Sequence, residues 1–241
     1  MLQIQYQHEQ NNEELIHCMF KDEANALLEL GIMTDTKPLK EAKQLLYRGE
    51  FLTKENYPTD SRFINNFETY SNCLLIDRWY PIIKDLTIET FLSYDLNSET
   101  EKTIIEKGWT KAFVKNAVKS LTFISHEKSI WPSSSFSEMK SLFLKHSFFN
   151  EYYSIRKYID SKNFNEENRY WVINNRIYNP NKYIPDIVVE ASEKLKILNN
   201  RFYVIDATPN LIIEVNPGET SIRYANNATV QFAEWLNYEF N

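Results

Sequence analysis

Hydrophobic residues recur along the chain at two spacings, and each spacing predicts a different kind of element. In Leu2–Tyr6 every second residue is apolar, which is typical of a half-buried strand. Between residues 13 and 30 the apolar side chains lie three and four apart, which predicts an amphipathic helix. Gly31 follows directly, and we expect it to be the C-cap of this helix, because glycine tolerates the left-handed backbone found there.

Further strands and helices follow along the rest of the chain. The predicted strands cover residues 45–49, 51–53, 73–76, 112–115, 152–159, 170–173, 176–178, 203–206 and 211–216, and the predicted helices cover residues 62–70, 98–107, 137–146, 187–198 and 227–238. Polar residues accumulate between 87 and 98, so we place a boundary there between an N-terminal region, 1–97, and a C-terminal region, 98–241.

Composition and charge count against several classes of protein. The net charge of −6 and the pI near 5.4 argue against broad nucleic-acid binding, which needs clustered lysine and arginine. Cys18 and Cys73 lie far apart and the four histidines are scattered, so the sequence has no zinc-binding spacing. The sequence starts without a signal-peptide pattern, and no apolar run approaches the roughly 20 residues that cross a bilayer. Together with unpaired thiols, these features predict a cytoplasmic protein with neither membrane nor nucleic-acid partners.

Oxygen-bearing side chains accompany two apolar runs near the C-terminal end of the sequence. One run ends at Asp206, Pro209-Asn210 predicts a turn, and the second run carries Glu214 and Asn216. Because residues two apart in a strand point to the same face, Glu214 and Asn216 project together, and hairpin pairing can bring Asp206 beside them. Three hard oxygen ligands on one sheet face suit Mg²⁺ held together with nucleotide phosphates. The alternative is an ordinary solvated hairpin.

Basic side chains precede this cluster at strand-like positions. Lys115 and Lys119 lie four apart at a predicted strand end, where lysine either neutralises phosphate or extends into water. Arg156 lies within an alternating strand and can bind a phosphate or carboxylate bidentately, or pair with a surface acid. Glu167 and Arg169 lie two apart before an apolar run, and they form either a surface ion pair or part of a substrate site.

The order of these residues resembles the ATP-grasp superfamily. More narrowly, it resembles a clade of small bacterial and phage ATP-grasp proteins named for two arginines and a lysine. The matching segments are Phe113–Lys115 with Lys119, Ile155–Arg156, Glu167–Val172, Tyr203–Asp206 and Ile213–Asn216. The resemblance covers about residues 100–225, and the Glu-x-Asn after an Asp-bearing strand is its most specific part.

The resemblance implies an α+β fold in which two α+β subdomains hold ATP between antiparallel sheets, preceded by a small α/β N-terminal domain. Residues 1–97 would form this substrate-side region, and residues 98–241 would form the ATP-grasp domain, with a lid part at about 110–150 and a metal-binding sheet at about 151–241. Larger relatives close over ATP with a glycine-rich loop, whereas residues 121–137 contain no glycine. Trp131–Ser137 is the candidate lid, because it is polar and interrupted by proline.

The resemblance also implies roles for the matching residues. Lysines would meet the α- and β-phosphates, the two arginines would face the transferred phosphoryl group or the substrate carboxylate, and a glutamate would order the arginines. Adenine would lie against strand backbone near residues 151–158. The implied residues are Arg156, Arg169 and Glu167 for catalysis, Lys115, Lys119, Glu151, Lys157 and Tyr158 for the nucleotide, and Asp206, Glu214 and Asn216 for Mg²⁺.

The implied activity is ATP- and Mg²⁺-dependent ligation of a carboxylate to an amine through an acyl phosphate, with a small molecule or a peptide as substrate. Phosphoryl transfer needs positioning and charge neutralisation, which these residues would provide. Two other interpretations stay open. A metal nuclease also places acids on paired strands, but Asn216 stands where such nucleases have lysine. A nucleotide-binding module without turnover would keep the fold, yet here Lys115 and the three metal-ligand candidates are all retained.

Overall fold

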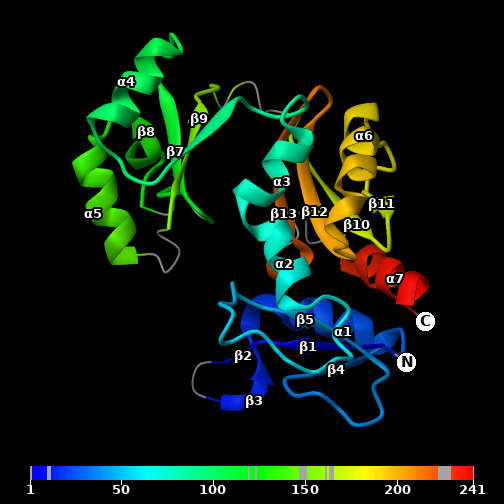
Figure 1. Cartoon of the computed structure of the whole chain (residues 1–241). Coiled ribbons are helices and arrows are strands. Elements are labelled where there is room, and N and C mark those ends of the chain that lie inside the picture. Colours follow the sequence, from blue (N-terminus) through cyan, green and yellow to red (C-terminus); the bar gives the residue numbers. More distant parts are fainter. Residues whose placement is uncertain are drawn as a thin grey trace. The chain divides into compact units, whose positions relative to one another are not determined.

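The computed structural model describes residues 2–9, 12–118, 120–122, 124–146, 151–160, 162, 166–221 and 229–240. The chain forms two compact units: unit 1 comprises Met1–Leu74 and Asn168–Asn241, and unit 2 comprises Leu75–Glu167. Unit 1 therefore combines the two ends of the sequence, whereas unit 2 is one continuous segment (Figure 1).

Unit 1 begins with a small parallel sheet. Strand β1 (Leu2–Tyr6) lies between β4 (Met33–Asp35) and β5 (Gln44–Arg48), and both neighbours run parallel to it. Helix α1 (Lys21–Glu29) precedes β4, and its C-cap is Leu30; Gly31 follows with a φ of 77°, and its N–H donates to the Leu28 carbonyl at 2.9 Å. The predicted first strand is confirmed, and Gly31 has the expected left-handed backbone one residue after the cap position that the sequence assigned to it.

The second sheet of unit 1 is antiparallel, in the order β11–β10–β12–β13. Its strands are β10 (Asn168–Ile173), β11 (Arg176–Tyr178), β12 (Phe202–Thr208) and β13 (Leu211–Pro217). Asn174 and Asn175, between β10 and β11, have φ values of 48° and 67°. This left-handed pair is what a two-residue hairpin turn requires, so the predicted hairpin is confirmed.

Alternation along β12 separates two packed faces of this sheet. Phe202 and Val204 join the main hydrophobic core of unit 1, to which β1, α1 and α7 (Thr229–Phe240) also contribute. Tyr203, between them, points to the other face, where its hydroxyl lies 3.4 Å from that of Ser192 on α6 (Asp186–Leu195). Asp206 continues the face of Phe202 and Val204, so the register brings this acid to the end of the core-facing row.

Unit 2 is built on a second antiparallel sheet, in the order β6 (Thr90–Ser93), β9 (Tyr153–Lys157), β7 (Ala112–Asn116), β8 (Ile130–Trp131). Ala112, Val114 and Ile155 on one face pack into a core with α4 (Ser98–Glu106) and α5 (Phe136–His146). Asn97 caps α4, because its side-chain oxygen accepts from the N–H groups of Glu99 and Thr100 at 3.0 and 3.2 Å. The opposite face of the sheet carries polar and basic side chains.

The predicted helix over residues 13–30 is wrong in its first part. Strands β2 (His8–Glu9) and β3 (Asn12–Ile16) form an antiparallel pair, a short 3₁₀ turn η1 (Cys18–Phe20) follows, and α1 begins only at Lys21. The His17 N–H also bonds to the Gln7 carbonyl at 2.8 Å. Pairing of β2 with β3 satisfies the backbone groups that a longer helix would have satisfied, and tertiary pairing thus overrides the local pattern.

Two predicted strands, 51–53 and 73–76, are also wrong. The Leu52 N–H bonds to the Tyr70 hydroxyl at 3.2 Å, so a side chain replaces a strand partner there. Cys73 lies in α2 (Phe67–Leu74), and Ile76 begins α3 (Ile76–Ile83). Tyr70 and Cys73 are buried at helical spacing on α2, which the short apolar run alone could not distinguish from a strand.

The predicted helix over 62–70 begins later, at Phe67. Asn66 and Thr69 exchange hydrogen bonds between side chains and backbone at 2.9 and 3.0 Å, which fixes the start of α2. The compact units divide the chain at other positions than the predicted regions 1–97 and 98–241. The compact units reflect packing and not function, so the different roles expected for regions 1–97 and 98–241 stay a prediction. Among the described residues, no helix has the length and apolar character needed to span a bilayer.

Candidate functional site

Strands β12 and β13 bring three oxygen-bearing side chains together. Asp206 pairs with Glu214, and Val204 pairs with Asn216. Directly opposite residues in an antiparallel pair share a face, as do residues two apart in one strand. Asp206, Glu214 and Asn216 therefore lie on one face of the sheet, as the sequence predicts. Asp206 is only 2% exposed, whereas Glu214 and Asn216 are half-buried.

A β-bulge lies within this cluster. The register shifts between Asp206 and Ala207, which pair with Glu214 and Ile212, so Ile213 is the extra residue on β13. Bulges bend a strand and redirect neighbouring side chains, and they are common next to functional sites. The extra residue lies immediately before Glu214 and therefore sets the direction in which this carboxylate leaves the sheet.

The third strand adds an arginine to the same face. Arg169 on β10 pairs in register with Asp206, and its Nε and Nη2 donate to the two carboxylate oxygens at 2.8 and 2.7 Å. The Arg169 side chain is 11% exposed and that of Asp206 is 3% exposed, so this is a nearly buried bidentate pair. A carboxylate has about four acceptor sites, so Asp206 can bind Arg169 and a cation together.

The sequence did not predict the pairing of Arg169 with Asp206. The two residues are 37 apart, and only the strand order β10–β12–β13 makes them neighbours. The sequence interpretation assigned the ordering role to Glu167, which lies directly before β10 and is half-buried. That assignment stays a prediction.

The donor set fits Mg²⁺, the metal that the resemblance implies. Two carboxylates and one amide provide hard oxygen ligands, which Mg²⁺ and Ca²⁺ prefer, and Mg²⁺ typically uses few protein ligands. Among the residues that the structure describes, no group of three or more His, Cys, Asp or Glu side chains could hold a metal ion. The cluster of Asp206, Glu214 and Asn216 is compatible with that result, because only two of its members are of those types.

In unit 2, basic and hydroxyl side chains share the sheet face opposite the hydrophobic core. Arg156 pairs with Phe113 and Thr90, and Lys115 pairs with Ser154. Lys115, Ser154 and Arg156 therefore lie on the same face. Arg156 is 4% exposed, and its Nη2 donates to the Thr87 hydroxyl at 3.4 Å. Lysine, arginine and hydroxyl groups on one rigid face suit the binding of phosphate oxygens. Lys119 lies outside the described residues.

The segment predicted to meet adenine surrounds strand β9. Glu151 is exposed just before the strand, Lys157 is exposed at its end, and Tyr158 follows half-buried. Because β9 lies between β6 and β7, its backbone groups are used within the sheet. The Tyr158 N–H, directly after the strand, bonds to the Lys111 carbonyl at 3.3 Å and is used as well.

A histidine that the sequence interpretation missed lies close to Tyr158. The His126 ring, in the 3₁₀ turn η2 (His126–Ser129), is 6.4 Å from the Tyr158 ring and 5.8 Å from that of Phe113. Lys111 Nζ lies 5.4 Å from the Tyr158 ring centroid. Phe113 is two residues before Lys115 on β7, so strand alternation could have indicated that it shares the basic face.

The predicted lid, Trp131–Ser137, joins two elements of unit 2. Trp131 ends β8, and α5 begins at Phe136. The Ser134 N–H bonds to the Ile130 carbonyl at 2.9 Å, and Ser134 is buried. The segment between the elements is therefore a short hydrogen-bonded turn, and its role as a lid stays a prediction.

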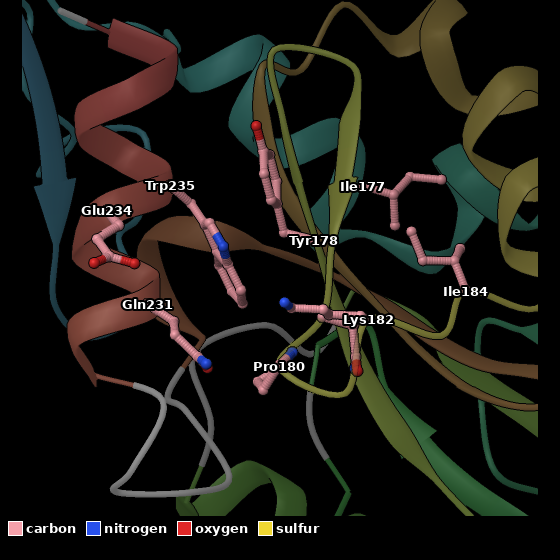
Figure 2. Close-up of a pocket in the computed structure, with 9 residues that line it drawn as sticks. Ile177, Tyr178, Pro180, Lys182, Ile184, Gln231, Glu234 and Trp235 are labelled. Carbon is pink, nitrogen blue, oxygen red and sulfur yellow. The ribbon is translucent and has the colours of Figure 1, made fainter.

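Unit 1 also contains a cavity of about 380 Å³ beside α7 and β11. Figure 2 shows Trp235 and Gln231 projecting from α7 toward Pro180 and Lys182. The rings of Tyr178 and Trp235 are stacked, with centroids 5.2 Å apart. None of the sequence-predicted site residues lines this cavity, so the interpretation of the oxygen cluster does not depend on it.

Comparisons with known proteins identify the fold. No protein-family model matches the chain, and no curated protein matches it. Solved structures resemble it over its whole length: D-cycloserine synthetase DcsG (TM-score 0.65, 9% identity, 100% of both chains) and the RimK domain protein ATP-grasp from Sphaerobacter thermophilus (TM-score 0.64, 10% identity, 100% of both chains). A third is the ATP-grasp ligase PsnB complexed with minimal precursor, Mg and ADP (TM-score 0.58, 7% identity, 100% of this chain and 97% of that one).

The chain thus has the ATP-grasp fold, a mixed α+β architecture with antiparallel sheets, and the predicted fold class is confirmed. At these levels of sequence identity the likeness establishes the fold alone.

Proposed function

We propose that the protein is an ATP- and Mg²⁺-dependent ligase that joins a carboxylate to an amine through an acyl phosphate. We also propose that it belongs to the clade of small ATP-grasp proteins named for two arginines and a lysine. The observation that carries this proposal is the register of β10, β12 and β13, which aligns Arg169, Asp206, Glu214 and Asn216 on one sheet face. The ATP-grasp fold supports it independently.

Asp206, Glu214 and Asn216 are the proposed magnesium ligands. When bound, Mg²⁺ would neutralise phosphate charge and orient the triphosphate for transfer. Arg169 holds Asp206 through two hydrogen bonds, so it would orient this ligand as well as supply positive charge. Half-buried Glu214 and Asn216 keep the accessibility that a ligand needs.

Lys115 and Arg156 are the proposed phosphate-binding residues of unit 2. Lys115 would bind the α- and β-phosphates as a compact charge, and Arg156 would face the transferred phosphoryl group or the substrate carboxylate. Lys119 is a second candidate for the phosphates. Glu167 would order the arginines, and Glu151, Lys157 and Tyr158 would surround the base.

The proposed reaction has two bond exchanges. A substrate carboxylate oxygen attacks the γ-phosphorus of ATP, and the bond from that phosphorus to the β-bridging oxygen breaks, which yields an acyl phosphate and ADP. The amine then attacks the acyl carbon, phosphate leaves, and the amine loses a proton. The positive charges of Lys115, Arg156 and Arg169 would stabilise the charge that builds up on the transferred group.

The substrate class follows only in outline. Among the structures with this fold, PsnB is a ligase solved with a minimal precursor, and DcsG is a D-cycloserine synthetase. For this chain we propose carboxylate and amine substrates that are either small molecules or peptides.

The test is a turnover assay with a metabolite and peptide extract, in which ADP release is measured and new condensed products are sought by mass spectrometry. We expect ADP release that depends on the extract and on Mg²⁺. Glu214→Ala should abolish this release, because the change removes an accessible ligand and no core packing. Glu29→Gln removes an exposed carboxyl group from α1 and should keep full activity. ATP binding without turnover in any extract would favour the nucleotide-binding module, and Mg²⁺-dependent DNA cleavage without any response to ATP would favour the nuclease.

A further inference from the structure

A buried carboxyl group lies immediately after the strand that carries Glu214 and Asn216. Glu219 belongs to the 3₁₀ turn η5 (Gly218–Thr220), which follows β13, and it is only 1% exposed. Its Oε1 accepts from Asn65 Nδ2 at 2.5 Å. Its Oε2 is buried without a hydrogen-bond partner in the described part of the chain. A buried acid with one unsatisfied oxygen is costly, so its presence at this position needs a reason.

The last residue of β5, Arg48, and the next residue, Gly49, hydrogen-bond to the backbone of the same turn. The Gly49 N–H donates to the Glu219 carbonyl at 3.0 Å. Arg48 Nη1 donates to the carbonyls of Gly218 and Ser221, the latter at 2.8 Å. Arg48 is fully buried, and Glu23 fixes its guanidinium through two hydrogen bonds of 2.8 Å. The turn therefore rests on an arginine that has little freedom to move.

The side chain of Glu219 is held by a separate pair of amides. Asn65 donates to Asn200 Oδ1 at 2.9 Å as well as to Glu219, and the Arg201 N–H donates to Asn65 Oδ1 at 3.0 Å. Asn200 in turn accepts from the Phe202 N–H at 2.8 Å. The first residue of β12 and the turn after β13 are thereby joined through Glu219 and two buried asparagines.

Packing leaves this turn almost no room to shift. A Cβ atom on Gly218 would lie 2.5 Å from the Phe202 ring, so the turn lies directly against β12. Asn216 lies in β13, two residues before Gly218 begins the turn, so a displacement of the turn would act on Asn216 through Pro217 alone. An error of about 1 Å in a ligand position is enough to impair a metal or catalytic site.

Resting on the proposed function, we propose that Glu219 is a positioning residue: its buried carboxyl group, gripped by Asn65, fixes the turn after β13 and so places Asn216 and Glu214 for the metal–nucleotide complex. Packing alone does not require an acid, because an apolar side chain would fill the same space at lower cost. In the described part of the chain, the ionisable groups that interact electrostatically with Glu219 include Arg48 from β5, Tyr57, and Tyr70 and Cys73 from α2.

The test compares ATP affinity with Mg²⁺ and with a chelator, measured by calorimetry. The ratio of the two affinities reports the metal ligands, whereas the affinity in chelator reports the remaining contacts. Loss of a residue that orients metal ligands typically lowers metal affinity by about 10- to 100-fold. We therefore expect Glu219→Ala to reduce the ratio by about tenfold or more. The affinity in chelator should change by less than about twofold. Glu219→Gln keeps an acceptor oxygen for Asn65 and should restore most of the ratio.

Matched variants separate positioning from general destabilisation. Leu236→Ala removes core packing from α7, which provides none of the hydrogen bonds described for Glu219 and its turn, and it should lower stability without changing the ratio. Asn65→Ala removes the donor and should reduce the ratio as Glu219→Ala does, so it tests the proposal even if Glu219→Ala does not fold. A normal ratio in folded Glu219→Ala and Asn65→Ala would overturn the positioning role. Wild-type protein without any Mg²⁺-dependent increase in ATP affinity would contradict the proposed function instead.

Discussion

The buried carboxyl group of Glu219 predicts an unusual dependence of stability on pH. Burial raises the pKa of Glu219 from its ordinary value of 4.5 to about 7, against the opposing effects of Asn65 and Arg48. The folded protein therefore binds this proton more tightly than the unfolded chain does. Stability from this group is fully present below about pH 4.5 and is lost as pH rises toward 7, because the unfolded chain then releases a proton that the folded chain retains.

The size of the effect follows from the two pKa values. A difference of one unit in pKa between the folded and unfolded states corresponds to about 1.4 kcal/mol of stability, so the difference between 4.5 and about 7 for Glu219 corresponds to about 3 kcal/mol. Most of that loss, about 2–3 kcal/mol, falls between about pH 5 and about pH 8. Titration of the other groups that face Glu219 does not overlap this range, because burial raises the pKa of Tyr57, Tyr70 and Cys73 above their usual values.

The assay is urea unfolding of wild type and Glu219→Gln across this pH range. Taking the difference between the two proteins at each pH removes the contribution of the histidines and the other acids, which both proteins share. We expect the variant to gain about 2–3 kcal/mol relative to wild type from about pH 5 to about pH 8. Glu29→Gln, which alters an exposed carboxyl group of the same unit, should show a difference that is flat with pH. A flat difference for Glu219→Gln as well would refute the assignment of a raised pKa to this group.

Two further predictions concern the remaining polar contacts. Arg169→Ala leaves Asp206 buried without its charge partner and should destabilise unit 1 by about 3–5 kcal/mol, measured by urea unfolding. Replacing both Arg169 and Asp206 with leucine should recover most of that loss. A loss below about 1 kcal/mol in Arg169→Ala would show that the pair is not buried in solution. Asn97→Ala removes the cap of α4 and should lower the stability of this helix by about 1 kcal/mol, which weaker hydrogen-exchange protection in α4 would report. Asn181→Ala, in unit 1, should leave the protection of α4 unchanged.

The sequence predicted the oxygen cluster because its geometry is local. Glu214 and Asn216 are two apart in one strand, and a short turn connects them to Asp206, so alternation and a hairpin register were enough. The pairing of Arg169 with Asp206 was not predictable in the same way. It depends on β10 lying beside β12, and that strand order is set by packing among distant segments.

The errors of the sequence interpretation have physical causes of the same kind. Cys73–Ile76 is too short for its apolar pattern to distinguish strand from helix, and the helix period becomes visible only with Tyr70 included. Unit 1 joins both ends of the chain, so a boundary read from a local change in polarity near residue 97 could not reveal it. Glu219 was also missed, because a lone glutamate after Pro-Gly is normally exposed and only the surrounding burial identifies it.

In the proposed function, the face formed by β12 and β13 binds the metal that accompanies ATP. Titration of a non-hydrolysable ATP analogue into the protein, with Mg²⁺ and with chelator, tests it most directly when wild type is compared with Glu214→Gln and Lys115→Ala. The account predicts that Glu214→Gln loses the Mg²⁺-dependent part of the affinity, and that Lys115→Ala weakens binding under both conditions. If both variants bind the magnesium complex as tightly as wild type, these residues do not form the site.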